Sequence, residues 1–306
     1  IEGNQWDGCV IDESCDIRPG TFGRSILPAL SHRNGWCRRI GVPKRFGMGA
    51  AEFKAACDNP NTLYLNWPST DILTEDQLSF ARANLDERDF REQYMASWET
   101  AAGLIFYAFD AVLNVQETVY NPSLPLIIGS DFNVDPMCWV ICQQHDDGKE
   151  LHVLDEVFLR NTNTKNTLDA LYFRFKEHTG GFQFYGDATG RARKTAATES
   201  DYLIIRNDKR FHRPSVFYPR SNPARKDRFA ACNALLLNAA GQRRCKIHPR
   251  CKRLIADLEN RGYMEGTTDA NDYGDLGHMS DAWGYIVYML YRIRVQLEGT
   301  PRVFIK

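Results

Sequence analysis

The stretch that decides the fold is LIIGSDFNVDP, residues 126–136. A short apolar run over 126–128 predicts a buried strand, which carries Asp131 at its end. An ionised carboxylate beside such a run is costly unless something compensates its charge, and a bound cation is a common solution. The alternative is a strand-end aspartate that only turns the chain through residues 133–136. The surrounding sequence has to decide between these two interpretations.

Regular elements continue downstream of this stretch. Residues 137–143 and 151–159 predict two further strands separated by an Asp-Asp-Gly turn, and together with the first strand they form an antiparallel meander. A helix over 164–178 and a strand over 182–187 follow. Further helices are predicted over 200–206, 224–238, 250–260 and 279–294, with strands over 215–218 and 245–247. This order predicts an α/β domain over 121–306, a ribonuclease-H-like mixed sheet with helices on both faces.

Residues 1–60 predict part of a different domain. A short apolar strand ends at Asp12 and Glu13, and at such a strand end nucleoside-triphosphate motors hold magnesium and polarise the attacking water. The alternative is a strand that simply runs into a loop. No Gly-x-x-x-x-Gly-Lys-Ser/Thr loop occurs in the sequence, so we expect only the C-terminal remnant of a P-loop-type ATPase domain here. Residues 61–120 predict a helical linker, in which Thr74 and Gln77 have the spacing of a capping box.

Composition narrows the class of protein. Hydrophobic residues make up 43% and charged residues 25%, as in ordinary soluble globular proteins. The net charge of −1 gives no overall basic signal, so any nucleic-acid contact has to come from local clusters. The chain begins with Ile1 and contains no apolar run near the ~20 residues of a membrane span, which predicts an internal fragment of a soluble protein.

Cysteine usage predicts reduced thiols. The nine cysteines are an odd number and are scattered through apolar segments, which is typical of a cytoplasmic protein rather than a disulfide scaffold. Cys245, His248 and Cys251 lie close in sequence but lack an evident fourth zinc ligand, so a structural role is favoured over zinc.

Three acidic residues stand at the ends of predicted elements. Asp131 and Asp187 end strands, and Asp281 lies in the first turn of an almost entirely apolar helix, where an unpartnered carboxylate is unexpected. Taken singly, Asp281 could merely complement the helix dipole. Three converging carboxylates would instead suit two Mg²⁺ or Mn²⁺ ions, which can activate water and stabilise the leaving oxygen of a phosphodiester. Glu156, or alternatively Asp135 or Asp275, could add a ligand.

Basic residues cluster near these acids in sequence. Positive charge beside a carboxylate cluster is what an enzyme needs to dock backbone phosphates, although most charge runs are only solvated surface. The candidate DNA-binding residues are Arg191, Arg193, Lys194, Arg225, Lys226 and Arg228.

The chain resembles the large subunit of tailed-bacteriophage terminases in a set of motifs that follow the family's order. They are Val10-Ile11-Asp12-Glu13, Gly41-Val42-Pro43, Phe90-Arg91-Glu92-Gln93-Tyr94, Gly129-Ser130-Asp131-Phe132-Asn133, Gly186-Asp187-Ala188-Thr189-Gly190 and His278-Met279-Ser280-Asp281-Ala282. The resemblance implies that Asp131, Asp187 and Asp281 are the nuclease triad. It also implies that Asp12 and Glu13 are the magnesium-binding and catalytic acids of the ATPase motor. Two departures are Val42, where the family commonly has Thr, and the missing phosphate-binding loop.

The resemblance also implies an activity. We expect a metal-dependent endonuclease that cuts concatemeric double-stranded phage DNA when packaging starts and ends, in the cytoplasm of the infected host. The full-length protein would also be an ATP-driven translocation motor that meets the portal, the small subunit and the procapsid, but no membrane. We expect no ATPase activity of this chain alone. The alternatives are another ribonuclease-H-like nuclease, such as a resolvase or transposase, and a non-catalytic DNA-binding or docking module.

Overall fold

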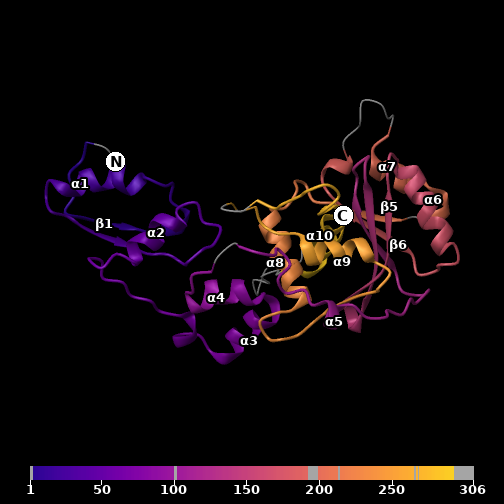
Figure 1. Cartoon of the computed structure of the whole chain (residues 1–306), viewed down its shortest axis with the longest axis horizontal. Helices are drawn as coiled ribbons and strands as arrows, with labels where there is room; N and C mark the ends of the chain where they lie inside the picture. Colours follow the sequence, from indigo (N-terminus) through magenta and orange to yellow (C-terminus); the bar gives the residue numbers. More distant parts are fainter. Residues whose placement is uncertain are drawn as a thin grey trace, which may run out of the picture. The chain divides into compact units, whose positions relative to one another are not determined.

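The computed structural model describes residues 3–99, 102–191, 199–212, 214–264, 267 and 269–292. The chain divides into two compact units, Ile1–Gly103 with Gly262–Ala270, and Leu104–Arg261 with Asn271–Lys306 (Figure 1). The division at residue 103 falls inside the predicted linker over 61–120. How these units correspond to functional domains stays a prediction.

The first unit contains a pair of parallel strands, β1 (Gly8–Ile11) and β2 (Trp36–Arg39), in which Cys9 lies opposite Cys37. Ile11 packs with Ile26 and Leu30 in a small core, next to the short helix α1 (Leu27–Ser31). The predicted strand that ends at the Asp12-Glu13 pair is therefore confirmed. Helix α2 (Ala50–Cys57) follows and buries Phe53.

Helices α3 (Glu75–Asn84) and α4 (Glu87–Met95) form the rest of the first unit. The capping box between Thr74 and Gln77 is confirmed, and Asp86 caps α4 through the backbone N–H groups of residues 88 and 89. On α4, the rings of Phe90 and Tyr94 stack with centroids 5.3 Å apart. Its buried Glu92 pairs with Arg45 at 3.0 Å, which ties the helix to the chain that follows β2.

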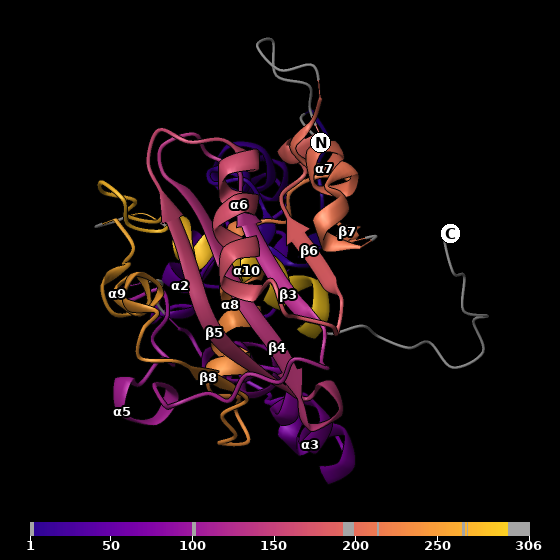
Figure 2. The same ribbon diagram turned by 90° about the vertical axis from the view of Figure 1, so that its right-hand side faces the viewer.

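The second unit is built on a six-stranded mixed sheet in the order β7-β6-β3-β4-β5-β8. Strands β5, β4, β3 and β6 lie side by side in Figure 2. The strands are β3 (Leu126–Asp131), β4 (Met137–His145), β5 (Glu150–Leu159), β6 (Phe182–Gly186), β7 (Ser215–Phe217) and β8 (Cys245–Ile247). The first three are antiparallel, whereas β6, β7 and β8 add in parallel. An antiparallel meander extended by parallel strands is the predicted ribonuclease-H-like arrangement, which is confirmed.

Helices cover both faces of this sheet (Figure 1). On one face, α6 (Thr164–Phe175) and α7 (Asp201–Asn207) bury Leu168, Leu171 and Ile205 against strand residues such as Trp139. On the other face α10 (His278–Tyr291) packs on β3, β4 and β6. Helices α8 (Arg225–Leu236) and α9 (Lys252–Asn260) pack against α10, and the short α5 (Ala111–Asn114) contacts β8. The predicted burial of α10 is confirmed.

All nine cysteines have free thiols. Cys245 and Cys251 are buried, and burial raises the pKa of both thiols, which keeps them protonated. His248 pairs instead with Glu117 at 2.7 Å.

No helix in the described part of the chain is both long enough and apolar enough to cross a membrane.

Candidate active site

Three carboxylates meet at one edge of the sheet in the second unit. Asp131 is the last residue of β3, and Asp187 directly follows β6, the parallel neighbour in which Gly186 pairs with Ser130. Asp281 comes from the first turn of α10. Tyr285 lies one turn beyond Asp281 on α10, and the charges of all three aspartates act on its hydroxyl group. Burial, together with these carboxylates and against Arg228, raises the pKa of Tyr285 to about 12. The structure therefore brings together the three aspartates that the sequence singled out.

The close approach of α10 to β3 depends on Gly129. A Cβ atom at this position would lie 2.2 Å from the Ala282 carbonyl oxygen and 2.8 Å from the Ile286 side chain. Only glycine fits between the strand and the helix, so its absent side chain lets the first turn of α10 reach the strand end.

Asp131 has polar partners and also like charges around it. Its Oδ2 accepts from Asn133 at 2.9 Å and lies 3.0 Å from His278 Nδ1. Burial raises the pKa of Asp131; the His278 hydrogen bond opposes this, and the charges of Asp281 and Asp187 add to it. The same contact with Asp131 raises the pKa of His278. Burial and neighbouring carboxylates thus oppose the ionisation of Asp131, and His278 favours it.

Asp187 is 8% exposed and organises the turn that follows it. Its carboxylate accepts hydrogen bonds from the Thr189 hydroxyl and, at 3.1 Å, from the Gly190 backbone N–H. Its carbonyl oxygen accepts from the Tyr202 hydroxyl at 2.6 Å. The motif from Gly186 to Gly190 is thus a strand end followed by a turn that its own aspartate caps.

Asp281 lies between two buried arginines. Arg261 is fully buried and reaches the Asp281 carboxylate at 2.9 Å, and Arg228 reaches it at 3.2 Å. Burial opposes ionisation of Asp281, but the charges of Arg261 and Arg228 outweigh it and lower its pKa. Arg261 also pairs with Asp272 at 2.7 Å.

Sequence reasoning missed both arginine partners. Arg228 lies on the same helical stripe of α8 as the buried Cys232 and Leu235, and an arginine on an apolar stripe was the available signal. Arg261 directly follows α9 and comes near Asp281 only through the tertiary fold, so no local pattern pointed to it.

The additional acidic candidates have other partners. Glu156 accepts hydrogen bonds from the backbone N–H groups of Arg253 and Leu254 at 2.9 and 3.0 Å, and so caps the first turn of α9. Asp135 and Asp275 both pair with Arg160. None of these contacts joins the three aspartates.

Within the described ranges, no group of three or more His, Cys, Asp or Glu side chains is arranged to hold a metal ion. The donor chemistry nevertheless fits a hard cation, because carboxylate oxygens are the ligands that such ions prefer and the charges of Asp187 and Asp281 act on Asp131. Hydrogen bonds to His278 and Asn133 and ion pairs to arginine occupy oxygens that an ion would need. These residues therefore suit divalent ions chemically, but they are paired with protein groups as they stand.

The basic candidates differ in exposure. Arg191 and Lys226 are exposed. Arg225 pairs with Asp272 at 2.8 Å, while Arg228 is buried over the ring of Tyr285 and does not face solvent. Arg193 and Lys194 lie outside the described residues.

Asp12 and Glu13 lie in the first unit, at the end of β1. Asp12 accepts from the backbone N–H of Glu13 at 2.9 Å, and Lys44 bridges Glu13 and Asp16 at 2.8 and 2.6 Å. These hydrogen bonds to Asp16 and Glu13 raise the pKa of Lys44. One lysine thus pairs with two of the acidic residues next to this strand end.

The second unit is a ribonuclease-H-like domain with three aspartates at the carboxyl edge of its central strands. The whole chain is similar in structure to the large terminase of a thermophilic bacteriophage, at 14% sequence identity and a TM-score of 0.62, over 95% of this chain and 70% of that one. A structure of the same phage terminase in complex with ATP-gamma-S gives the same identity and TM-score over 94% and 71%. The chain therefore has the large-terminase fold that its motifs predict.

The comparisons with protein-family models and with curated protein sequences give no match.

Proposed function

We propose that this chain carries the metal-dependent endonuclease of a phage DNA-packaging terminase. The observation that supports this most directly is the convergence of Asp131, Asp187 and Asp281 on one sheet edge, in a chain with the fold of a large terminase. The substrate would be concatemeric double-stranded DNA, cut when packaging starts and ends.

The three aspartates would share one task, although their surroundings differ. Asp131 and Asp187 would hold divalent ions, with Asp281 as the third ligand. Such ions supply an activated water and stabilise the leaving oxygen of a phosphodiester. Asn133 and His278 orient the Asp131 carboxylate, and Arg228 and Arg261 keep Asp281 ionised.

DNA would be held mainly through its phosphates. Arg191 follows Asp187 closely and is exposed, and Lys226 is exposed at the start of α8 beside Arg225. Arg193 and Lys194 extend the same basic run in the sequence. Arg228 is not proposed as a phosphate contact, because Asp281 and the protein interior occupy it.

The remaining assignments follow the same proposal. Residues 1–60 would be the end of an ATPase domain that contains Asp12 and Glu13, residues 61–120 a linker, and residues 121–306 the nuclease. The full-length motor would use ATP and meet the portal, the small subunit and the procapsid in the cytoplasm of the host. Because this sequence contains no phosphate-binding loop, Asp12 and Glu13 cannot by themselves position a triphosphate.

The test is plasmid cleavage with Mg²⁺, Mn²⁺ or a chelator, together with calorimetric titration of the ion. Asp131→Asn removes one ligand charge but keeps the side-chain shape. We expect cleavage to fall by at least about 100-fold and ion binding to be lost, because an ion held by three carboxylates depends on each of them. Thermal stability should stay the same or rise, because like charges repel less.

Glu156→Gln is the matched control, because this carboxylate caps α9 and should affect cleavage far less. An Asp131→Asn protein that folds and cuts at the original rate would contradict the assignment. If Asp131→Asn unfolds instead, the aspartate is structural, and the docking-module alternative gains support.

A further inference from the structure

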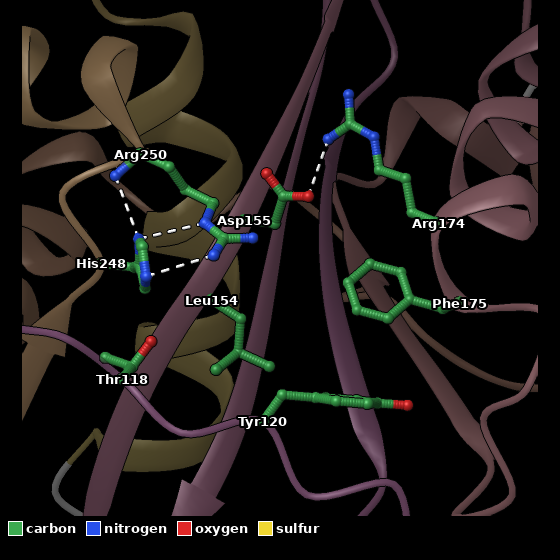
Figure 3. A pocket seen from close by; sticks show the side chains of 8 residues that line it. All are labelled: Thr118, Tyr120, Leu154, Asp155, Arg174, Phe175, His248 and Arg250. Atoms are coloured by element: carbon green, nitrogen blue, oxygen red, sulfur yellow. Dashed lines mark hydrogen bonds and ion pairs between the residues drawn. The ribbon is translucent and has the colours of Figure 1, made fainter.

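A pocket of about 380 Å³ opens on the α6 face of the sheet, at the C-terminal end of α6. Figure 3 shows Arg174 and Arg250 reaching toward Asp155 of β5 from opposite sides, with Phe175 and Tyr120 along the adjoining wall. His248 lines the pocket behind Arg250. Its volume falls within the range of small-molecule sites, about 300–1,000 Å³.

This pocket lies apart from the three aspartates. Asp155 pairs with Ile141, and Ile141 pairs with Ile128, which lies three positions before Asp131 on β3. Arg174 and Phe175 come from α6, whereas Asp281 comes from α10 on the other face. A ligand in this pocket would therefore not sit at the proposed nuclease site.

The charge of the pocket favours an anion. Two guanidinium groups face one carboxylate, which leaves the lining positive. Arg174 bonds through Nη1 to Asp155 at 2.9 Å and to the Glu156 carbonyl at 2.7 Å. Arg250 bonds to His248 through its backbone N–H, Nε and Nη2. The exposed Glu117 side chain lies 2.7 Å from His248. Arginine binds phosphate through two parallel hydrogen bonds. Arg174 Nε and Nη2 and Arg250 Nη1 take no part in the contacts just given.

Tyr120 supplies a surface for a flat ring. It is 38% exposed, and the Phe175 ring supports it with centroids 5.6 Å apart and the two ring planes inclined by 58°. Its hydroxyl is held by His178 at 2.9 Å, which fixes the orientation of the ring. Exposed aromatic side chains of this kind stack on nucleobases, which contributes about 1–3 kcal/mol per base.

We propose that this pocket binds a 5′-phosphorylated nucleotide, either free or at the end of a nucleic-acid strand. The phosphate would lie at the donors of Arg174 and Arg250 that do not contact Asp155 or His248, and the base would stack on Tyr120 beside Phe175. Asp155 would accept a hydrogen bond from the sugar or from a base amino group. An acidic peptide would use the guanidinium groups but leave both the aromatic wall and Asp155 without a matching group, so the nucleotide is the better fit.

The experiment is calorimetric titration of the whole chain with deoxyadenosine 5′-monophosphate, in a chelator so that no DNA is cut. Deoxyadenosine and inorganic phosphate, titrated separately, should each bind at least about tenfold more weakly, because each makes only part of the contacts. Arg174→Gln and Arg250→Gln should each weaken the nucleotide by about tenfold. Tyr120→Ala should do the same, while Lys176→Gln, which removes an exposed charge directly after α6 and outside the pocket lining, should have no effect.

Oligonucleotides distinguish the two sources of the nucleotide. If a 5′-phosphorylated strand binds more tightly than its 5′-hydroxyl counterpart, and Arg250→Gln removes this difference, the ligand is a strand end. If only the mononucleotide depends on Arg250, the ligand is free. Nucleotide binding that is absent at millimolar concentration, or unchanged in both arginine variants, would overturn the proposal. Melting temperatures without ligand show that each variant is folded.

Discussion

Asp281 shows how a buried charge is compensated inside the second unit. An aspartate on a buried helix needs compensation, and two arginines from α8 and from the end of α9 supply it. Because Arg261 is fully buried and pairs with Asp272 and Asp281 together, losing it would leave Asp281 with Arg228 and Asp272 with Arg225 as their arginine partners.

Arg261→Met should therefore lower the free energy of unfolding by about 3–5 kcal/mol, the usual cost of removing one partner of a buried ion pair. Chemical denaturation measures this loss. The double variant Arg261→Met, Asp281→Asn should recover part of it, because the buried carboxylate charge that Arg261 compensated is removed as well. A single variant as stable as the wild type would show that the ion pair contributes little net stability.

Glu92 in the first unit predicts a dependence of stability on pH. Burial raises its pKa from 4.5 to about 7, although the charge and backbone N–H of Arg45 act in the opposite direction. Between these two values the unfolded chain releases the proton and the folded chain keeps it. The contribution of Glu92 to folding stability should therefore be greatest below pH 4.5, fall as the pH rises to about 7, and then stay level.

Unfolding free energies measured across this range for wild type and Glu92→Gln check the prediction. The variant lacks this titrating group, so the difference between the two proteins should change within the window and stay constant above it. A difference that does not vary with pH would mean that folding leaves the pKa of Glu92 unchanged.

At the scale of elements, the contact between β3 and α10 sets the geometry of the candidate site. Gly129→Ala would place a methyl group 2.2 Å from the Ala282 carbonyl oxygen, so the helix would have to move away. We expect a loss of about 1–3 kcal/mol in stability, as for overpacked cores, and a larger loss of cleavage because Asp281 moves with the helix.

Gly284→Ala tests the same helix at a position with room. A Cβ atom there would meet its nearest neighbours at 3.8 Å, which is ordinary contact. Since alanine favours helix over glycine by about 1 kcal/mol, this variant should be as stable as the wild type or more so. Equal effects of the two substitutions would argue against a special role for Gly129.

At the scale of the whole molecule, a net charge of −1 means that any attraction to DNA comes from local positive groups. Replacing both Arg191 and Lys226 by Ala should reduce the slope of log affinity against log salt by about 2, because each lost phosphate contact contributes about 0.9. Fluorescence anisotropy of a labelled duplex at several salt concentrations, in a chelator, gives this slope.

The control for this measurement removes the same charge elsewhere. Lys149 and Lys176 are both exposed, and the corresponding double alanine variant should keep the wild-type slope. If both double variants lose the same amount, overall charge and not a defined DNA path accounts for binding.

Much of the fold could be predicted because hydrophobic periodicity is local. The apolar run over 126–128, the alternation of strands and helices after it, and the capping box at Thr74 specify their elements within a few residues, and the structure confirms them. Asp131, Asp187 and Asp281 also stood out locally, each as an acid at the end of an apolar element. Their joint role in catalysis stays a prediction.

Only the tertiary structure decided which groups these carboxylates meet. The sequence predicts Arg228 as a DNA-binding charge, but it pairs with Asp281 inside the protein. The sequence predicts Glu156 as a further metal ligand, but it caps α9. The pocket beside Asp155 likewise gathers residues from four separate stretches of the chain. Sequence periodicity determines which face of an element is buried. The partners of a buried charge depend instead on contacts between residues that are distant in the chain. Arg261 lies 20 positions from Asp281, and Arg228 lies 53 positions from Asp281.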